Sequence, residues 1–161
     1  MRKAFICPTK YVQGEDELLN LGYFVKSFGD SALLIAHSDD VNRVKEKLER
    51  TAEKFNIRFV ESGFCGECSR REVSRLQELA REHNCTCTIG LGGGKAIDTA
   101  KCVAEGKNLI IVPTIAATDA PTSHSAVLYE SKCQAALRLQ RRSMWGGERN
   151  ERGFSTGDPL L

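Results

Sequence analysis

The sequence predicts an α/β fold in which a parallel sheet is flanked by helices. Short apolar runs of strand type occur at residues 32–36, 57–60, 87–89 and 108–112. Amphipathic helical patterns separate these runs, and the connections are short. Between the third strand and the third helix lies a glycine-rich segment at residues 90–95. Regular alternation of strands and helices is typical of a parallel sheet.

The first half of the alternation begins with residues 32–36, a continuous apolar run that suits a strand buried on both faces. Asp39 or Asp40 can cap the following helix, whose apolar positions recur every three or four residues as far as Phe55. Residues 57–60 alternate between polar and apolar side chains, which predicts a second strand.

The second half begins with a capping-box pattern, in which Ser69 is followed three residues later by Glu72. This pattern predicts the start of a second amphipathic helix at Ser69. A strand at 87–89, a helix at 95–106 and another buried strand at 108–112 complete the alternation. We find no internal repeat and no low-complexity segment.

Residues 90–95 predict a phosphate-binding turn. Consecutive glycines at 92–94 let the bare backbone approach a bulky anion, and glycine reaches positive φ without steric cost. A helix that begins near Lys95 would point its free N–H groups and the positive end of its dipole at that anion. The segment is not a Walker A loop, because neither Ser nor Thr follows Lys95. The alternative is a tight strand-to-helix turn without a ligand.

Other polar residues follow the predicted strands. His37 and Thr114 come at the carboxyl ends of strands, where ligands bind in such sheets. The hydroxyl-rich loop at 113–123 contains one carboxylate, Asp119, which can accept hydrogen bonds from a polyol. Alternatively, Asp119 forms an Asx-turn in a surface loop. Asp98 either contacts a ribose or nicotinamide group or pairs with a neighbouring lysine on a solvated face.

Composition narrows the functional classes. The chain has 161 residues, of which 41% are hydrophobic and 27% are charged, as in ordinary globular domains. A formal net charge of +2 gives no argument for a nucleic-acid partner, and no apolar run is long enough for a membrane span. The seven cysteines are not spaced like a secreted disulfide framework. We therefore expect a cytoplasmic protein with neither a nucleic-acid nor a membrane partner.

Two closely spaced cysteine pairs, Cys65 with Cys68 and Cys85 with Cys87, raise the question of a structural zinc site. The second pair has one intervening residue instead of two, which departs from the usual ribbon spacing. In a strand, Cys85 and Cys87 would share one face. The alternative, which we favour, is that these are core or loop cysteines.

Four segments occur in an order that resembles bacterial glycerol dehydrogenases, within the metal-dependent, iron-type alcohol dehydrogenase superfamily. They are Lys-Tyr-Val-Gln-Gly at 10–14, Gly-Phe-Cys-Gly-Glu-Cys-Ser at 63–69, Gly-Gly-Gly-Lys-Ala-Ile-Asp-Thr-Ala-Lys at 92–101, and Pro-Thr through Asp-Ala-Pro at 113–121. The resemblance covers about residues 4–130. It implies NAD-linked oxidation of glycerol to dihydroxyacetone, with other diols as further possible substrates. It also implies a Rossmann-like parallel sheet flanked by helices, the N-terminal domain of a dehydroquinate synthase-like fold. In the family a helical domain that binds zinc or a similar divalent ion follows.

The resemblance also implies site residues. The implied cofactor contacts are His37, Gly92, Gly93, Gly94, Lys95, Ala96, Asp98, Thr114, Ala117, Ser123, Ser125 and Tyr129. The implied substrate contact is Asp119, and no catalytic or metal-binding residue is assigned.

Three of these positions depart from the family pattern. Ala117 stands where the family usually has Ser, and Ser125 stands where relatives carry Leu, so that only a backbone contact is transferred for Ser125. His37 replaces the Asp that holds the adenine ribose, which would weaken NAD binding or relax selection against NADP. Alternatively, His37 is an exposed residue at the end of a strand, and Asp39 or Asp40 takes over its role.

The resemblance stops after residue 130, which divides the chain into a dinucleotide-binding domain at 1–130 and a divergent basic tail at 131–161. We expect one or two turns of basic helix at 134–142 and disorder at 146–158. The family's metal ligands, one Asp and two His, are expected beyond residue 130, where Asp158 is the only Asp and no His occurs.

These observations predict that the helical metal-binding domain is absent and that the chain alone is inactive. We expect a frameshifted or otherwise foreign end on a truncated gene; a genuine short paralogue whose basic tail binds a partner is the alternative. The apolar face that would meet the missing domain predicts association into a homo-oligomer. A non-catalytic nucleotide-binding or protein-interaction module is the competing functional hypothesis.

Overall fold

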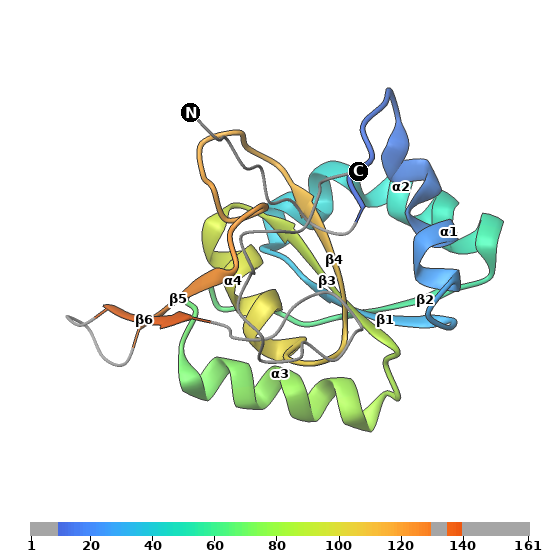
Figure 1. Ribbon diagram of the computed structural model, residues 1–161. Helices are drawn as coiled ribbons and strands as arrows, with labels where there is room; N and C mark the ends of the chain where they lie inside the picture. The colour runs from blue at the N-terminus through green and yellow to red at the C-terminus, as the bar shows by residue number, and fades with distance from the viewer. Residues whose placement is uncertain (1–9, 130–134, 140–161) are drawn as a thin grey trace, which may run out of the picture.

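The computed structural model describes residues 10–129 and 135–139 of the chain. Four parallel strands form a sheet with helices on both faces, which confirms the predicted fold class (Figure 1). In chain order the elements are η1 (Glu17–Asn20), α1 (Leu21–Lys26), β1 (Ser31–Ile35), α2 (Ser38–Phe55), β2 (Arg58–Glu61), α3 (Arg70–Glu82), β3 (Cys87–Gly92), α4 (Gly94–Val103), β4 (Asn108–Pro113), β5 (Ser125–Tyr129) and β6 (Ala135–Leu139). No helix in this part of the chain is long and apolar enough to cross a membrane.

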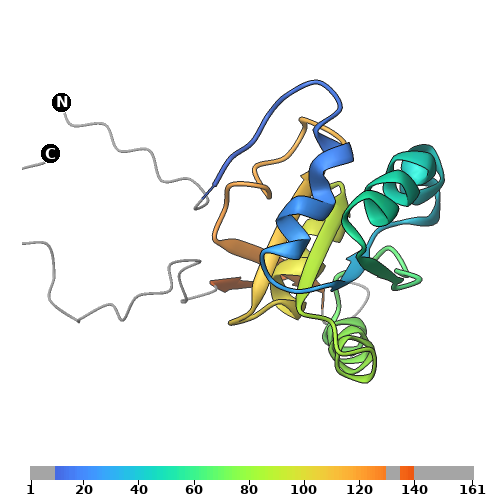
Figure 2. The same ribbon diagram turned by 90° about the vertical axis from the view of Figure 1, so that its right-hand side faces the viewer.

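The strand order in the sheet is β2-β1-β3-β4. One apolar cluster packs α1 and α2 against one face of the sheet, and a second packs α3 and α4 against the other. Figure 2 views the molecule from the side of α1 and α2. The chain runs from β1 outward to β2 and then returns to the other side of β1 as β3. The topological switch point, where ligands bind in such sheets, therefore lies between β1 and β3.

Helix α2 starts slightly earlier than the sequence predicts. Its N-cap is His37, whose Nδ1 accepts a hydrogen bond of 3.4 Å from the Asp39 backbone N–H. The predicted cap at Asp39 or Asp40 is therefore wrong, because both residues lie inside the first helical turn. From that position their carboxylates still interact favourably with the positive end of the helix dipole.

The start of α3 confirms the predicted cap, although the capping box is only half formed. The Ser69 hydroxyl accepts a hydrogen bond of 3.2 Å from the Glu72 N–H. The Glu72 carboxylate does not return to Ser69; it accepts instead from the Cys65 N–H at 3.3 Å and from the Arg75 guanidinium at 2.7 Å. The bond to Arg75 lowers the pKa of Glu72, and the backbone bond from Cys65 adds to this effect.

The strands largely follow the prediction. Strand β1 is buried along its whole length, as expected for a strand covered on both faces, and β3 is also buried and extends to Gly92. Strand β4 was expected to be buried, but it is only half-buried because it lies at the edge of the described sheet.

A second correction concerns residues 134–142, for which we expected turns of basic helix. Residues 135–139 instead form β6, which pairs antiparallel with β5 and so extends the ordered fold past residue 130 (Figure 1). The two strands lie close together in sequence, but the helical pattern considered for 134–142 gives no sign of their pairing. The expected disorder at 146–158 falls outside the described residues.

Neither η1 nor α1 was predicted from the sequence. Helix α1 has only six residues and no side-chain cap, so it lacks the usual signals. The buried hydroxyl of Thr51, on α2, attaches this segment to the rest of the fold. The hydroxyl donates to the Leu19 carbonyl and accepts from the Gly22 N–H, each at 2.9 Å.

Candidate dinucleotide-binding site

The glycine run forms the turn between β3 and α4. Gly92 ends the strand with φ of 142°, Gly93 is the N-cap, and Gly94 is the first helical residue. Helices α2 and α3 carry side-chain caps, whereas within the described part of the chain no side chain caps α4. The N–H groups at the start of α4 are therefore available to an anion, as the sequence predicts.

Neighbouring atoms explain why this segment needs glycine. A Cβ on Gly90 would lie 2.6 Å from the Ala100 Cβ, so the absence of a side chain lets α4 pack closely on β3. A Cβ on Gly92 would lie 3.1 Å from an Asp40 carboxylate oxygen and 3.2 Å from the Ala96 Cβ, and the φ of Gly92 also disfavours other residues. The turn therefore fits tightly between α2 and the first turn of α4.

The loop after β4 lies over the same turn. A Cβ on Gly93 would lie 3.3 Å from Ile115 Cδ1, and one on Gly94 would lie 3.3 Å from the Thr118 hydroxyl. The Thr114 N–H donates a hydrogen bond of 3.1 Å to the Gly92 carbonyl, which fixes the start of the loop beside the turn. The predicted proximity of Thr114 to the glycine run is confirmed.

His37 and the acidic residues that follow it lie on the other side of the switch point. His37 is exposed and serves as the cap of α2. Of the two alternative acidic residues, Asp39 is exposed, whereas Asp40 is largely buried and faces Gly92, with Arg43 at 3.6 Å. Asp40 is thus the carboxylate that the fold places beside the glycine turn. The ribose contact expected for His37 stays a prediction.

Lys95 is on the first turn of α4, but its ammonium group pairs with Glu67 at 2.5 Å. This hydrogen bond raises the pKa of Lys95, so the side chain stays charged. The ammonium also lies 6.0 Å from the centre of the Tyr129 ring. Glu67 belongs to the segment at 63–69, which contributed to the family resemblance and to the zinc question, but Glu67 itself was given no role. The sequence could have suggested this ion pair, because Lys95 is a cation at the glycine turn and Glu67 is an acid in a glycine-containing loop.

Asp98 and Ala96 lie deeper than expected. Asp98 is buried, and its carboxylate accepts from the Val127 N–H at 3.1 Å and from the Lys101 ammonium at 3.4 Å. The alternative that Asp98 pairs with a lysine is therefore confirmed for Lys101, but the pair is buried and does not lie on a solvated face. Ala96 is buried in the cluster beneath α3 and α4. The cofactor contacts expected for both residues stay predictions.

The remaining expected residues lie along the loop and the start of the hairpin. Ala117 is exposed, and the Ser123 hydroxyl accepts from the Ser125 N–H at 3.0 Å. Asp119 is exposed; its backbone carbonyl accepts from Thr122 and Ser123. Within residues 10–129 no hydrogen bond is made to the Asp119 carboxylate, so this turn is formed through the backbone and not through an Asx side chain.

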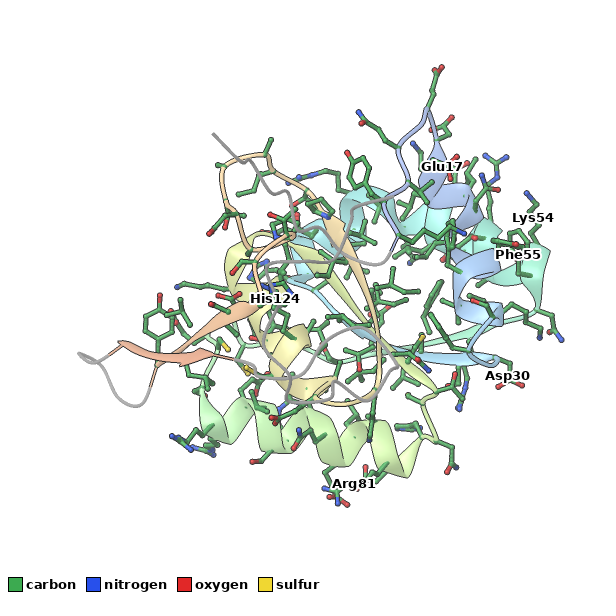
Figure 3. The ribbon with its side chains drawn as sticks, in the orientation of Figure 1. Glu17, Asp30, Lys54, Phe55, Arg81 and His124 are labelled. Carbon is green, nitrogen blue, oxygen red and sulfur yellow. The ribbon has the colours of Figure 1, made fainter. Side chains whose placement is uncertain are left out.

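The loop after β4 and the start of β5 lie on a different side of the molecule from α1 and α2. Figure 3 shows His124 near α4 at the end of the loop, whereas Lys54 and Phe55 lie on the other side of the sheet, near α1. Tyr129, at the end of β5, is partly exposed and approaches Lys95. The glycines, Lys95, Thr114 and Tyr129 therefore lie around the start of α4, whereas Ser125 lies beside the last turn of that helix, where its carbonyl accepts from Lys101.

Comparison with known proteins identifies the family. The sequence pattern of the iron-containing alcohol dehydrogenases matches residues 8–144. The chain belongs to the iron-containing alcohol dehydrogenase family. The match extends beyond residue 130, where the sequence analysis placed the end of the resemblance.

Glycerol dehydrogenases are among the similar members of this family. Those of Pseudomonas putida and Citrobacter freundii are 40% and 37% identical to the chain over 131 residues, which are 80% of this chain and 36% of each relative. The crystal structure of a probable glycerol dehydrogenase from Sinorhizobium meliloti superposes with a TM-score of 0.73 at 35% identity, covering 88% of this chain and 39% of that one. The chain thus spans little more than a third of the length of these relatives.

Iron-containing alcohol dehydrogenases are named for a metal, but the described residues do not form a metal site. Among residues 10–129, no three His, Cys, Asp or Glu side chains lie close enough to hold a metal ion. Cys65 is exposed, and Cys68 and Cys87 are buried, as expected for loop and core cysteines. Cys85 precedes β3 and packs against the cluster on the α3 and α4 side of the sheet, whereas Cys87 belongs to the cluster on the α1 and α2 side. The expectation that the two cysteines share a face is therefore wrong. Burial raises the pKa of Cys87 to about 12.

Proposed function

We propose that this chain supplies the coenzyme-binding part of an NAD-dependent glycerol dehydrogenase, an oxidoreductase that converts glycerol to dihydroxyacetone. The observation that carries the proposal is the uncapped start of α4 behind three glycines, at the switch point of a parallel sheet. The identity of 36–40% to glycerol dehydrogenases supports the choice of substrate.

The residues around the turn have distinct roles in this proposal. The free N–H groups of the first turn of α4 bind the pyrophosphate, and Lys95 supplies a positive charge beside it. Bound NAD would accept the hydride from the substrate. The loop after β4 covers the turn and limits the access of water, while the exposed Asp119 carboxylate accepts hydrogen bonds from the hydroxyl groups of the polyol.

Other expectations remain part of the proposal. They are glycerol or a related diol as the substrate, zinc or another divalent ion as the metal of the full-length family, a homo-oligomer and a cytoplasmic location. Among the described residues, no group of His, Cys, Asp or Glu side chains could hold that metal.

Calorimetric titration with NADH tests the proposal directly. We expect saturable binding by the purified chain, and we expect Lys95→Ala to weaken it by about tenfold through loss of one charged phosphate contact. Lys107→Ala is the matched control, because Lys107 is an exposed lysine beyond the opposite end of α4. Absence of NADH binding, or equal loss in both variants, would contradict the proposal. A glycerol and NAD assay with added zinc then measures how much turnover this chain supports.

A further inference from the structure

Strand β5 runs alongside α4 in the opposite direction, and three contacts define this arrangement. The Lys101 ammonium donates to the Ser125 carbonyl at 2.8 Å. One turn nearer the start of α4, the Asp98 carboxylate accepts from the Val127 N–H at 3.1 Å. At the end of the strand, Tyr129 approaches Lys95 on the first turn of α4. Every second residue of β5 therefore meets a position about one helical turn further toward the glycine turn.

These contacts use one edge of the strand. In an extended strand, the N–H and C=O groups of alternate residues point to the same side, so residues 125, 127 and 129 present their backbone groups together. Strand β6 pairs with β5. On the edge that faces α4, the hydrogen-bond partners are the side chains of Lys101 and Asp98, followed by the Cys68 carbonyl, which accepts from the Tyr129 N–H at 2.8 Å.

The two side chains are unusual in being charged and buried. Lys101 is 4% exposed and Asp98 is 9% exposed, and their charged groups lie 3.4 Å apart. Burial lowers the pKa of Lys101, while the charge of Asp98 and, less strongly, that of Asp119 oppose this effect. A buried ion pair is seldom the most stable choice, because well-packed apolar residues often replace it without loss. Because Lys101 and Asp98 both bond to the backbone of β5, we infer that the pair fixes the position of that strand.

We propose that the buried Asp98–Lys101 pair positions β5 on α4 and thereby sets where Ser125 and Tyr129, two of the expected cofactor contacts, lie relative to the glycine turn. Both members are positioning residues, and Asp98 acts on the cofactor through the strand. This inference rests on the proposed function, because it assumes that a dinucleotide binds at the glycine turn.

The sheet order indicates which half of the dinucleotide the strand would meet. When the pyrophosphate lies at the start of α4, the adenosine half extends toward the neighbouring strand β1 and the nicotinamide half toward β4. The loop that leaves β4 leads directly into β5. A shift of β5 should therefore weaken binding of the nicotinamide half and leave the adenosine diphosphate half unchanged.

The test compares two ligands on one double variant. In Asp98→Leu with Lys101→Met, both charges are removed together, so no charge is left buried without a partner. We expect ADP-ribose, which lacks nicotinamide, to bind as tightly as to the unaltered chain, and NADH to bind about tenfold more weakly. An equal loss for both ligands, or no loss for either, would overturn the inference. If neither ligand binds the unaltered chain, the proposed function fails first.

Hydrogen exchange followed by mass spectrometry tests the position of the strand without any ligand. We expect faster exchange at residues 125–129 in the double variant and unchanged exchange in β1 and β3. Unchanged exchange at 125–129 would refute the inference whatever the ligands do. If the double variant does not fold, Asp98→Glu keeps the ion pair but moves the acceptor by one methylene, and the same pattern is expected to a smaller degree. The matched control removes the Glu78–Arg81 pair, an exposed ion pair on α3 that should change nothing.

Discussion

The close approach of Gly90 and Ala100 allows the packing of α4 on β3 to be tested by mutation. A Cβ added to Gly90 would lie 2.6 Å from the Ala100 Cβ, while its next neighbour, Ile97 Cα, would be at an ordinary 3.4 Å. Two carbon atoms cannot approach to 2.6 Å, so Gly90→Ala must push the helix away from the sheet. Overpacking a well-packed core costs about 1–3 kcal/mol, and we expect this variant to lose about 2 kcal/mol of unfolding free energy.

A compensating change should restore much of this loss. Ala100→Gly alone costs about 1 kcal/mol in helix propensity and about 1 kcal/mol for the buried methyl group. In the double variant the new methyl group of residue 90 fills the space that Ala100 vacates, so only the propensity cost remains. The double variant should therefore be more stable than the sum of the two single changes predicts, by roughly 2–3 kcal/mol.

Urea unfolding of the four proteins of this cycle, followed by circular dichroism, provides the measurement. Ala80→Gly is the control, because it changes a buried alanine on α3 and should add to Gly90→Ala without coupling. NADH affinity should fall in Gly90→Ala, since the start of α4 moves, and should recover in the double variant. Additive free energies, within about 0.5 kcal/mol, would refute the close contact.

Three further predictions concern single side chains. Glu67→Gln removes the carboxylate that competes for Lys95, so calorimetry should show tighter NADH binding; weaker binding would mean that Glu67 holds the lysine in place. The pKa of Glu72 is lowered below its ordinary 4.5, so its ionised form stabilises the fold above that pH and the contribution disappears as the pH falls through the folded-state value. Glu72→Gln should consequently flatten the acid side of a Tm profile, and an unchanged profile would contradict this. Peptide mapping after brief alkylation of the native protein at pH 8 should find Cys65 modified and Cys87 protected until denaturant is added, because Cys65 is exposed and burial raises the pKa of Cys87 to about 12.

The parts of the fold that follow from local patterns could be predicted from the sequence. Ser69 is a cap whose hydroxyl bonds to the backbone three residues later, and the apolar run of β1 is buried on both faces as a central strand must be. The cap of α2 was wrong because histidine is an uncommon cap and two stronger candidates, Asp39 and Asp40, follow it. Strand β6 was missed although it follows β5 closely in sequence, because we took the resemblance to end at residue 130 and expected helical turns at 134–142.

The candidate site divides along the same line. The position of the glycine turn follows from its place between a strand and a helix, and its neighbour Thr114 follows from strand order. The contacts of Lys95 with Glu67 and of Asp98 with Val127 do not, because these partners are each about thirty residues away in sequence. The pairing of Asp98 with a nearby lysine was among the expected alternatives. Sequence reasoning identified the charges of the site, but only the fold shows which of them are occupied by other residues of the chain.

The hydroxyl of Thr51 limits how the amino-terminal segment can vary. It is both donor and acceptor in the interior, so valine would match its shape but leave the Leu19 carbonyl and the Gly22 amide without partners. Each such orphaned group costs about 1–3 kcal/mol, which is more than a six-residue helix can recover by itself. Mild destabilisation should therefore detach η1 and α1 as a unit, and proteases should cut there before the sheet opens.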